Sequence, residues 1–224
     1  MSKMPNLQVV KIGGNVIDNP SALASFLQDF ASLDGPKLLV HGGGKIATHM
    51  ATSMGIESQM IEGRRVTDEE SLRIVTMVYA GWINKSIVAE LQGLSCNALG
   101  LTGPDGGIVL SKKRAAEPID YGFVGDIVSV NAAAISGLIS AGFSPIFAPI
   151  TADVSGQLLN TNADTMAQAF AIALSTSYQV TLTYCFEKKG VLLDPADDES
   201  VISSINPASF QELKDKGVVS AGMI

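Results

Sequence analysis

The sequence has few cysteines and histidines, and neither set is spaced like a metal site or a disulfide framework. Its two cysteines, Cys96 and Cys185, form no CxxC pair. This favours two reduced, buried thiols in a cytoplasmic protein. The two histidines, His41 and His49, have no cysteine or carboxylate pattern around them. The sequence therefore predicts no protein-held metal.

Long apolar runs are also absent, because no run reaches the roughly 18 residues of a membrane span. Met1–Pro5 lacks the apolar core of a signal peptide. The net charge of −7 argues against a nucleic-acid or anionic-membrane partner. There is no repeat, linker or low-complexity tract. With 46% hydrophobic and 17% charged residues, the 224-residue chain is suited to one α/β domain with a substantial core.

The first informative feature is an apolar run that ends in a lysine and two glycines, Val9–Asn15. We interpret it as a buried strand followed by a turn that holds phosphate. Lys11 supplies a positive charge, and Gly13 and Gly14 let backbone N–H groups approach an anion. A strand that ends in two glycines is more often a plain turn, so other anion-binding pieces must support this interpretation.

A second glycine turn follows the next strand. A helix after the cap Asn19-Pro20 leads to the strand Leu38–Val40, which makes a right-handed β-α-β unit with parallel strands. Three glycines, 42–44, then precede a helix, whose N-terminus attracts anions. The spacing matches neither a P-loop nor a dinucleotide fingerprint. A flexible loop is the alternative.

The segment 60–66 is predicted to be a short strand that carries Arg64 and Arg65 toward this region. Two arginines beside an anion site could bind a carboxylate. Thr67 and Glu70 predict a capping box for the longest helix, Asp68–Leu91. Its apolar stripe, Leu72, Val75, Tyr79 and Trp82, widened by Met77, Ile83, Ile87 and Leu91, fits a subunit interface and a core helix about equally.

The rest of the chain continues the α/β pattern. We expect strands near 97–103, 144–150 and 180–184, a β-hairpin within 104–130 with Lys112–Arg114 in solvent, and helices at 131–141, 163–174 and 204–216. A polar cluster, Asn160–Asp164, precedes the helix at 163. Asn162 is expected to cap that helix, and Asp164 suits its positive end, but the cluster could equally face the glycine turns.

These pieces favour phosphoryl transfer. No nucleophile is paired with a histidine base, whereas glycine turns follow two strands at the edge where open α/β sheets bind ligands. Phosphoryl transfer depends on positioning and charge neutralisation and needs no covalent residue.

The chain resembles the amino acid kinase family, and within it the kinases that act on N-acylglutamates. The resemblance covers essentially all residues. Its motifs are Val10–Gly14, Val40–Gly44, Gly63–Thr67, Leu159–Asp164 and Gly222–Ile224.

The resemblance implies a three-layer αβα sandwich around a mainly parallel open sheet, with residues up to about 175 holding the amino-acid substrate and residues from about 176 holding ATP with Mg²⁺. The reaction would phosphorylate the side-chain carboxylate of an N-acylglutamate in arginine biosynthesis. The acyl group, acetyl or succinyl, stays open. The resemblance implies that Lys11 stabilises the charge on the transferring phosphoryl group and that Asp164 orients the catalytic lysines. It also implies that Gly13 and Gly14 bind phosphate. The residues implied to bind the substrate are Gly43, Gly44, Arg65 and Asn160.

Two departures from the family pattern shape our expectations. Family members continue past Gly222–Ile224 with a second lysine and more of the ATP lobe, so we expect the chain as written to be incomplete and poorly active. The nucleotide loop is replaced at Tyr184–Gly190, where Lys188 or Lys189 could still meet a phosphate.

A non-catalytic acylglutamate-binding module and another carboxylate or carbamate kinase are the alternatives. We also expect a homodimer through the helix Asp68–Leu91.

Overall fold

The computed structural model describes residues 4–61, 64–194 and 196–218. Gly63 and the motif Gly222–Ile224 lie outside this part of the chain. The described elements are, in order, β1 (Asn6–Ile12), α1 (Gly14–Ile17), α2 (Pro20–Ser32), β2 (Lys37–His41), α3 (Gly44–Ser53), β3 (Met60–Ile61), β4 (Arg64–Arg65), α4 (Glu69–Val75), η1 (Thr76–Ile83), α5 (Asn84–Gly93), β5 (Ala98–Leu101), η2 (Asp105–Gly107), β6 (Val109–Lys113), β7 (Gly125–Val130), α6 (Ala132–Ser140), β8 (Ser144–Phe147), β9 (Ile150–Ala152), β10 (Leu158–Asn160), α7 (Ala163–Leu174), β11 (Gln179–Cys185) and α8 (Pro207–Asp215).

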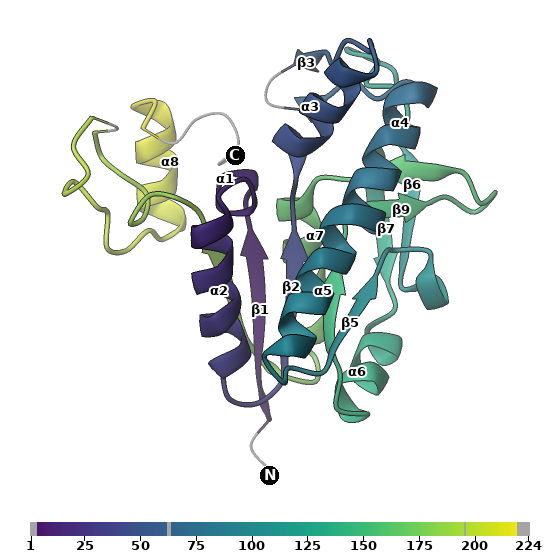
Figure 1. Cartoon of the computed structure of the whole chain (residues 1–224). Helices are drawn as coiled ribbons and strands as arrows, with labels where there is room; N and C mark the ends of the chain where they lie inside the picture. The colour runs from purple at the N-terminus through teal and green to yellow at the C-terminus, as the bar shows by residue number, and fades with distance from the viewer. Residues whose placement is uncertain (1–3, 62–63, 195, 219–224) are drawn as a thin grey trace.

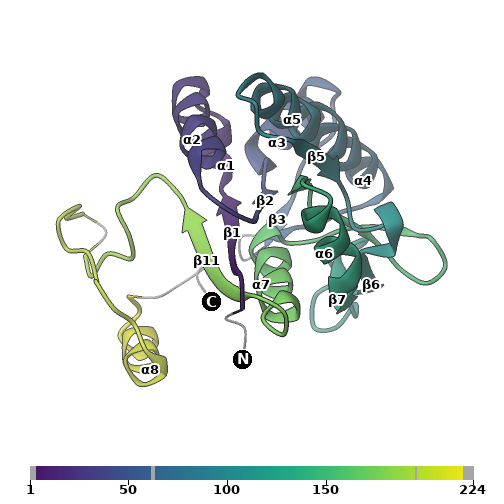
Figure 2. The same ribbon diagram turned by 90° about the horizontal axis from the view of Figure 1, so that it is seen from below.

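The core of the fold is a sheet with the strand order β11-β1-β2-β8-β5, and every pair in it is parallel. Helices cover both faces: α2 and the helix formed by α4, η1 and α5 lie on one side, and α6 and α7 lie on the other (Figures 1 and 2). This confirms the predicted three-layer αβα sandwich. A second sheet, β10-β9-β6-β7, extends the molecule beyond β5.

Strand β1 is apolar on both faces because it separates two hydrophobic clusters. Val10 packs with the helices α2 to α5, whereas its neighbour Val9 packs with α6 and α7. Consecutive side chains of a strand point to opposite faces, so a strand between two helical layers carries apolar residues on both faces. The predicted caps of α2 and α7 are confirmed, since Asn19 and Asn162 each accept hydrogen bonds from the first turn of their helix.

The long helix differs from its prediction in three ways. Its N-cap is Asp68, whose side chain accepts a hydrogen bond from Ser71, so the predicted capping box of Thr67 with Glu70 is wrong. Thr67 is instead fully buried beneath Asn160. The middle of the helix, η1, is a π-helix, and Trp82 is 70% exposed, whereas Leu72, Val75 and Tyr79 of the same predicted stripe are buried. The wider π turn rotates Trp82 out of that stripe.

Other boundaries also changed. The predicted strand at 60–66 is two short antiparallel strands, β3 and β4. The predicted strand at 144–150 divides into β8 and β9, which belong to different sheets. Of the cysteines, both are free thiols, but only Cys96 is buried and Cys185 is half-buried. No described helix has the length and apolar character needed to cross a membrane.

Candidate active site

The two glycine turns meet at the carboxyl ends of neighbouring parallel strands. Ile12, the last residue of β1, is in register with His41 of β2 and with Cys185 of β11. The N–H of Gly13 donates to the carbonyl of Cys185 at 3.2 Å, and the N–H of Gly42 donates to that of Ile12 at 3.1 Å. The strand register therefore places both turns side by side, as expected for ligand binding at this edge of an open sheet.

Lys11 lies at this junction and pairs with Asp164 of α7. Its ammonium nitrogen is 2.8 Å from a carboxylate oxygen of Asp164, with 14% of the lysine side chain exposed. A Cβ atom added to Gly13 would lie 3.8 Å from the same nitrogen, so the charge and the first glycine turn are adjacent. Both side chains are partly exposed, so an anion can still reach the ammonium group of Lys11.

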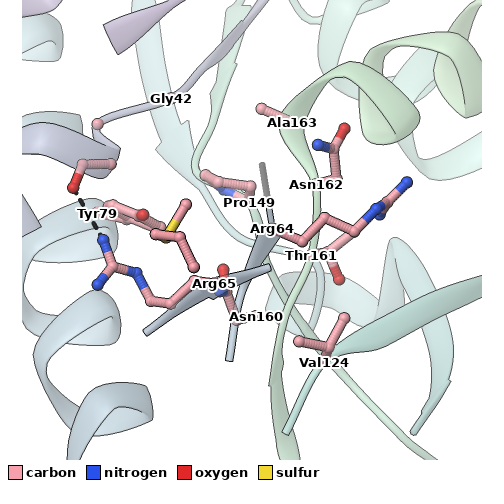
Figure 3. Close-up of a pocket in the computed structure, with 13 residues that line it drawn as sticks. Gly42, Arg64, Arg65, Tyr79, Val124, Pro149, Asn160, Thr161, Asn162 and Ala163 are labelled. Carbon is pink, nitrogen blue, oxygen red and sulfur yellow. Dashed lines mark hydrogen bonds between the residues drawn. The ribbon is translucent and has the colours of Figure 1, made fainter. Parts of the chain in front are cut away.

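A pocket opens beside the second glycine turn. Figure 3 shows the residues that line it, which are Gly42, Gly43, Gly44, Met60, Arg64, Arg65, Tyr79, Val124, Pro149, Asn160, Thr161, Asn162 and Ala163. All four residues predicted to bind substrate, Gly43, Gly44, Arg65 and Asn160, line this one pocket. Asp164 follows directly after Ala163, so the pocket and the ion pair adjoin.

Gly43 is required by its surroundings. Its φ of 144° lies in the region that L side chains rarely adopt. A Cβ atom there would come within 2.2 Å of Cδ1 of Ile83 and 3.3 Å of the Tyr79 ring. The turn can therefore approach the long helix only because residue 43 has no side chain.

Arg65 is buried, and its guanidinium is oriented by hydrogen bonds to three neighbours. Nη2 donates to the carbonyl of Gly44 at 2.9 Å and to Oγ1 of Thr48 at 2.7 Å, and Nη1 donates to Oγ of Ser58 at 2.5 Å. A guanidinium has five N–H donors. Three of them are used by these partners, and the hydroxyl of Tyr79 lies beside the same guanidinium.

Asn160 and Tyr79 complete the pocket walls. The side-chain amide of Asn160 donates to Oγ1 of Thr67 at 3.1 Å, which ties β10 to the segment after Arg65. Tyr79 is buried, and this burial raises the pKa of its hydroxyl, while the nearby Arg65 cation acts in the opposite direction. Sequence reasoning placed Tyr79 only on an apolar stripe, because nothing local in the sequence shows that a π turn brings it to Gly43.

Three further residues link the strand ends. Asn15 donates to a carboxylate oxygen of Glu187 at 2.6 Å, and its side-chain oxygen accepts from Lys45. This connects the turn after β1, the helix after β2 and the segment after β11. The sequence analysis named none of these as functional, since each is an ordinary exposed polar residue on its own.

Lys188 and Lys189 also lie after β11, but each is paired with a carboxylate. Lys188 is 2.6 Å from Asp198, and Lys189 contacts Glu199. The hydrogen bond to Asp198 and its negative charge raise the pKa of Lys188. Both lysines are largely exposed, so a phosphate could reach them only by exchanging with these partners. Within the described residues, no group of three or more His, Cys, Asp or Glu is arranged to hold a metal.

Together these observations define an α/β protein in which two glycine turns, one lysine and one arginine meet at the carboxyl edge of a parallel sheet. The family model described as "Amino acid kinase family" matches residues 6–224, and the chain belongs to that family.

Curated relatives and solved structures agree with this assignment. The chain is 57% identical over 222 residues to the acetylglutamate kinase of Cytophaga hutchinsonii, covering 99% of this chain and 84% of that protein. It is 53% identical over 218 residues to the acetylglutamate kinase of Bacteroides fragilis, covering 97% and 84%. The smu.665 protein of Streptococcus mutans has a similar fold, with a TM-score of 0.80, 26% identity and coverage of 97% and 85%.

Proposed function

We propose that this protein catalyses the ATP-dependent phosphorylation of the side-chain carboxylate of N-acetyl-L-glutamate, a step of arginine biosynthesis. The observation that carries the proposal is the Lys11–Asp164 pair beside a pocket lined by glycine turns and Arg65. Relatives more than 50% identical over nearly the whole chain are acetylglutamate kinases. Both lines point to the same reaction.

In this proposal the pocket holds the amino-acid substrate. The guanidinium of Arg65, which lines the pocket, binds the α-carboxylate. Gly43 and Gly44, at the N-terminus of α3, stabilise the reacting carboxylate through backbone N–H groups and the helix dipole. Asn160 contacts the substrate from the opposite wall. A carboxylate is ionised at neutral pH, so the reaction requires no general base.

Lys11 stabilises the charge that develops on the transferring phosphoryl group, and Gly13 and Gly14 donate N–H groups to phosphate oxygens. Asp164 is a positioning residue, because its carboxylate holds the Lys11 ammonium at the sheet edge. Preorganised charge of this kind accounts for much of the rate in phosphoryl transfer.

ATP is proposed to bind on the β11 side, toward residues from about 176 onward, while residues up to about 175 form the substrate lobe. Mg²⁺ would arrive with the nucleotide and neutralise phosphate charge. Lys188 and Lys189 would contact a phosphate by exchanging Asp198 and Glu199 for it. This exchange costs little free energy, since exposed ion pairs contribute little to stability. The reaction is proposed to take place in the cytoplasm.

We also propose a homodimer through the helix formed by α4, η1 and α5. Trp82 and Met77 are 70% and 49% exposed on η1, and large apolar side chains on a surface mark contact sites. Light scattering of the purified protein should give twice the mass of one chain. The double variant Met77→Lys, Trp82→Lys should give the mass of one chain. A single-chain mass for the unmodified protein would contradict the dimer.

The function is tested by a coupled assay of ADP release with N-acetylglutamate, N-succinylglutamate and glutamate compared side by side. We expect turnover with N-acetylglutamate and none with glutamate, whose free amine replaces the acyl amide. A higher kcat/KM with N-succinylglutamate would mean that this compound is the preferred substrate of the same type of reaction. ATP-dependent turnover with none of the three would contradict the proposal.

A further inference from the structure

A buried histidine lies directly beneath the glycine turn at residues 42–44. His41 ends β2 and is 0% exposed. Its Nδ1 is 2.9 Å from the carbonyl oxygen of Gly42, and its Nε2 is 3.1 Å from the amide nitrogen of Asn84. A carbonyl oxygen can only accept a hydrogen bond, so Nδ1 carries the proton and Nε2 accepts from Asn84. The ring is therefore held neutral in one tautomer.

Asn84, the first residue of α5, is 1% exposed and every polar atom of its side chain has a partner. The amide nitrogen donates also to the carbonyl of Ile146 at 2.9 Å. The side-chain oxygen accepts from the ammonium of Lys85 at 3.0 Å. Because its two donors and its acceptor are all used, the amide has a single orientation and fixes the histidine ring in turn.

The bond to Gly42 sets the direction of the next peptide group. In a trans peptide the carbonyl and the following N–H point to opposite sides of the chain. Since His41 holds the carbonyl of Gly42 on the buried side, the N–H of Gly43 points away from the histidine. Gly43 is a residue that lines the pocket.

The π-helical segment brings Asn84 into this contact. One extra residue in a turn rotates the following side chains by about 100° relative to a continuous α-helix. Tyr79 and Ile83 of η1 close on Gly43 from the same helix, since a Cβ atom at residue 43 would collide with Ile83. The same segment therefore packs on the glycine turn and provides the partner of His41.

We propose that His41 and Asn84 are positioning residues that hold the turn 42–44 in the conformation that binds the amino-acid substrate. This inference rests on the proposed role of that turn. A buried pair that served stability alone would produce the same hydrogen bonds, so the test must separate substrate binding from folding.

Two substitutions at residue 41 separate the two nitrogens. His41→Asn places an amide nitrogen near the position of Nδ1, so it keeps a donor for Gly42 and loses the contact with Asn84. His41→Gln places its amide near Nε2, so it keeps the contact with Asn84 and loses the donor for Gly42. Both remove the ring, and we expect a similar fall in the melting temperature. His49→Gln, an exposed change on α3, is the control.

We expect His41→Gln to raise both the Kd and the KM for N-acetylglutamate by roughly tenfold, which corresponds to the loss of one well-placed hydrogen bond. The Kd is measured by calorimetry without nucleotide. The KM for ATP should stay within about twofold, since that change is worth under half a kcal/mol. His41→Asn should stay close to the unmodified protein in both. An equal rise of the Kd for N-acetylglutamate in the two variants, or a rise in neither, would overturn the inference.

A spectroscopic readout is independent of activity. The chain has only two histidines, so ¹⁵N spectra contain the signals of two imidazole rings, with two nitrogens each, to assign. The His41 signal should show the Nδ1–H tautomer in the unmodified protein and disappear in both variants. An Nε2–H tautomer would contradict the inference. Failure of the unmodified protein to bind N-acetylglutamate would instead contradict the proposed function.

Discussion

The ammonium nitrogen of Lys11 lies 2.8 Å from a carboxylate oxygen of Asp164, which joins the end of β1 to the first turn of α7. The two residues come from opposite parts of the chain, and their contact brings the glycine turns and the cluster after β10 into one site. The lysine side chain is 14% exposed and that of the aspartate 40%, so the charged group is held in place but can be reached by a ligand.

Replacement of Lys11 by alanine should abolish turnover without unfolding the protein. The loss of a charge directed at the transferring phosphoryl group costs on the order of a hundredfold or more in kcat. The measurement is the steady-state rate of ADP release, with circular dichroism to check the fold. Lys112→Ala, a change to an exposed lysine of β6, is the matched control and should behave like the unmodified protein. Normal turnover of Lys11→Ala would show that Lys11 has no catalytic role.

Asp164→Asn should lower kcat while leaving the KM for N-acetylglutamate nearly unchanged. The amide keeps the shape of the side chain but no longer holds the ammonium of Lys11 by charge. We expect a loss of roughly tenfold to a hundredfold, because a catalytic group that is slightly misplaced costs about this much. Asp126→Asn is the control, since it breaks a different ion pair, with Arg114. An equal loss in both variants would argue against a specific role for Asp164.

Gly43→Ala should destabilise the protein and weaken substrate binding. The positive φ and the overlap with Ile83 together cost roughly 2–4 kcal/mol of unfolding free energy. Gly137→Ala is the control. Gly137 lies inside α6 and a Cβ atom there meets nothing within 4 Å, so alanine should stabilise by up to about 1 kcal/mol. Urea titration of both variants gives the comparison, and a Gly43→Ala protein of normal stability would contradict the packing described.

Stability should rise with pH in the window where His41 titrates, and should be lost as the pH falls. Burial lowers the pKa of His41 from 6.5 to about 4. Between these values the unfolded chain binds more protons than the folded protein, so the free energy of unfolding rises with pH. The contribution is fully present above about pH 6.5 and is lost progressively as the pH falls toward 4, with an upper limit of about 3 kcal/mol. Urea titrations across this range should show a flatter dependence for His41→Asn than for the unmodified protein.

Much of the site was predictable because its signals are local. A strand that ends in Lys11 and two glycines, the three glycines at 42–44 and the cap Asn162 each depend on neighbours within a few residues. Backbone freedom of glycine, helix capping and the alternation of buried strands all act over such short distances. The parallel pairing of the first two strands followed from the same patterns, whereas the sandwich with helices on both faces was implied by the family resemblance.

The sequence by itself determined which residues follow β1 and β2 and which residues cap α2 and α7. The tertiary structure alone decided which side chains meet. The π segment carries Trp82 outward and leads into Asn84, whose side chain is hydrogen-bonded to His41 of β2 and to Ile146 of β8, which lie far away in the sequence. The same is true of the pair Lys11–Asp164. These contacts join residues far apart in the chain, and only the closed fold brings them within bonding distance.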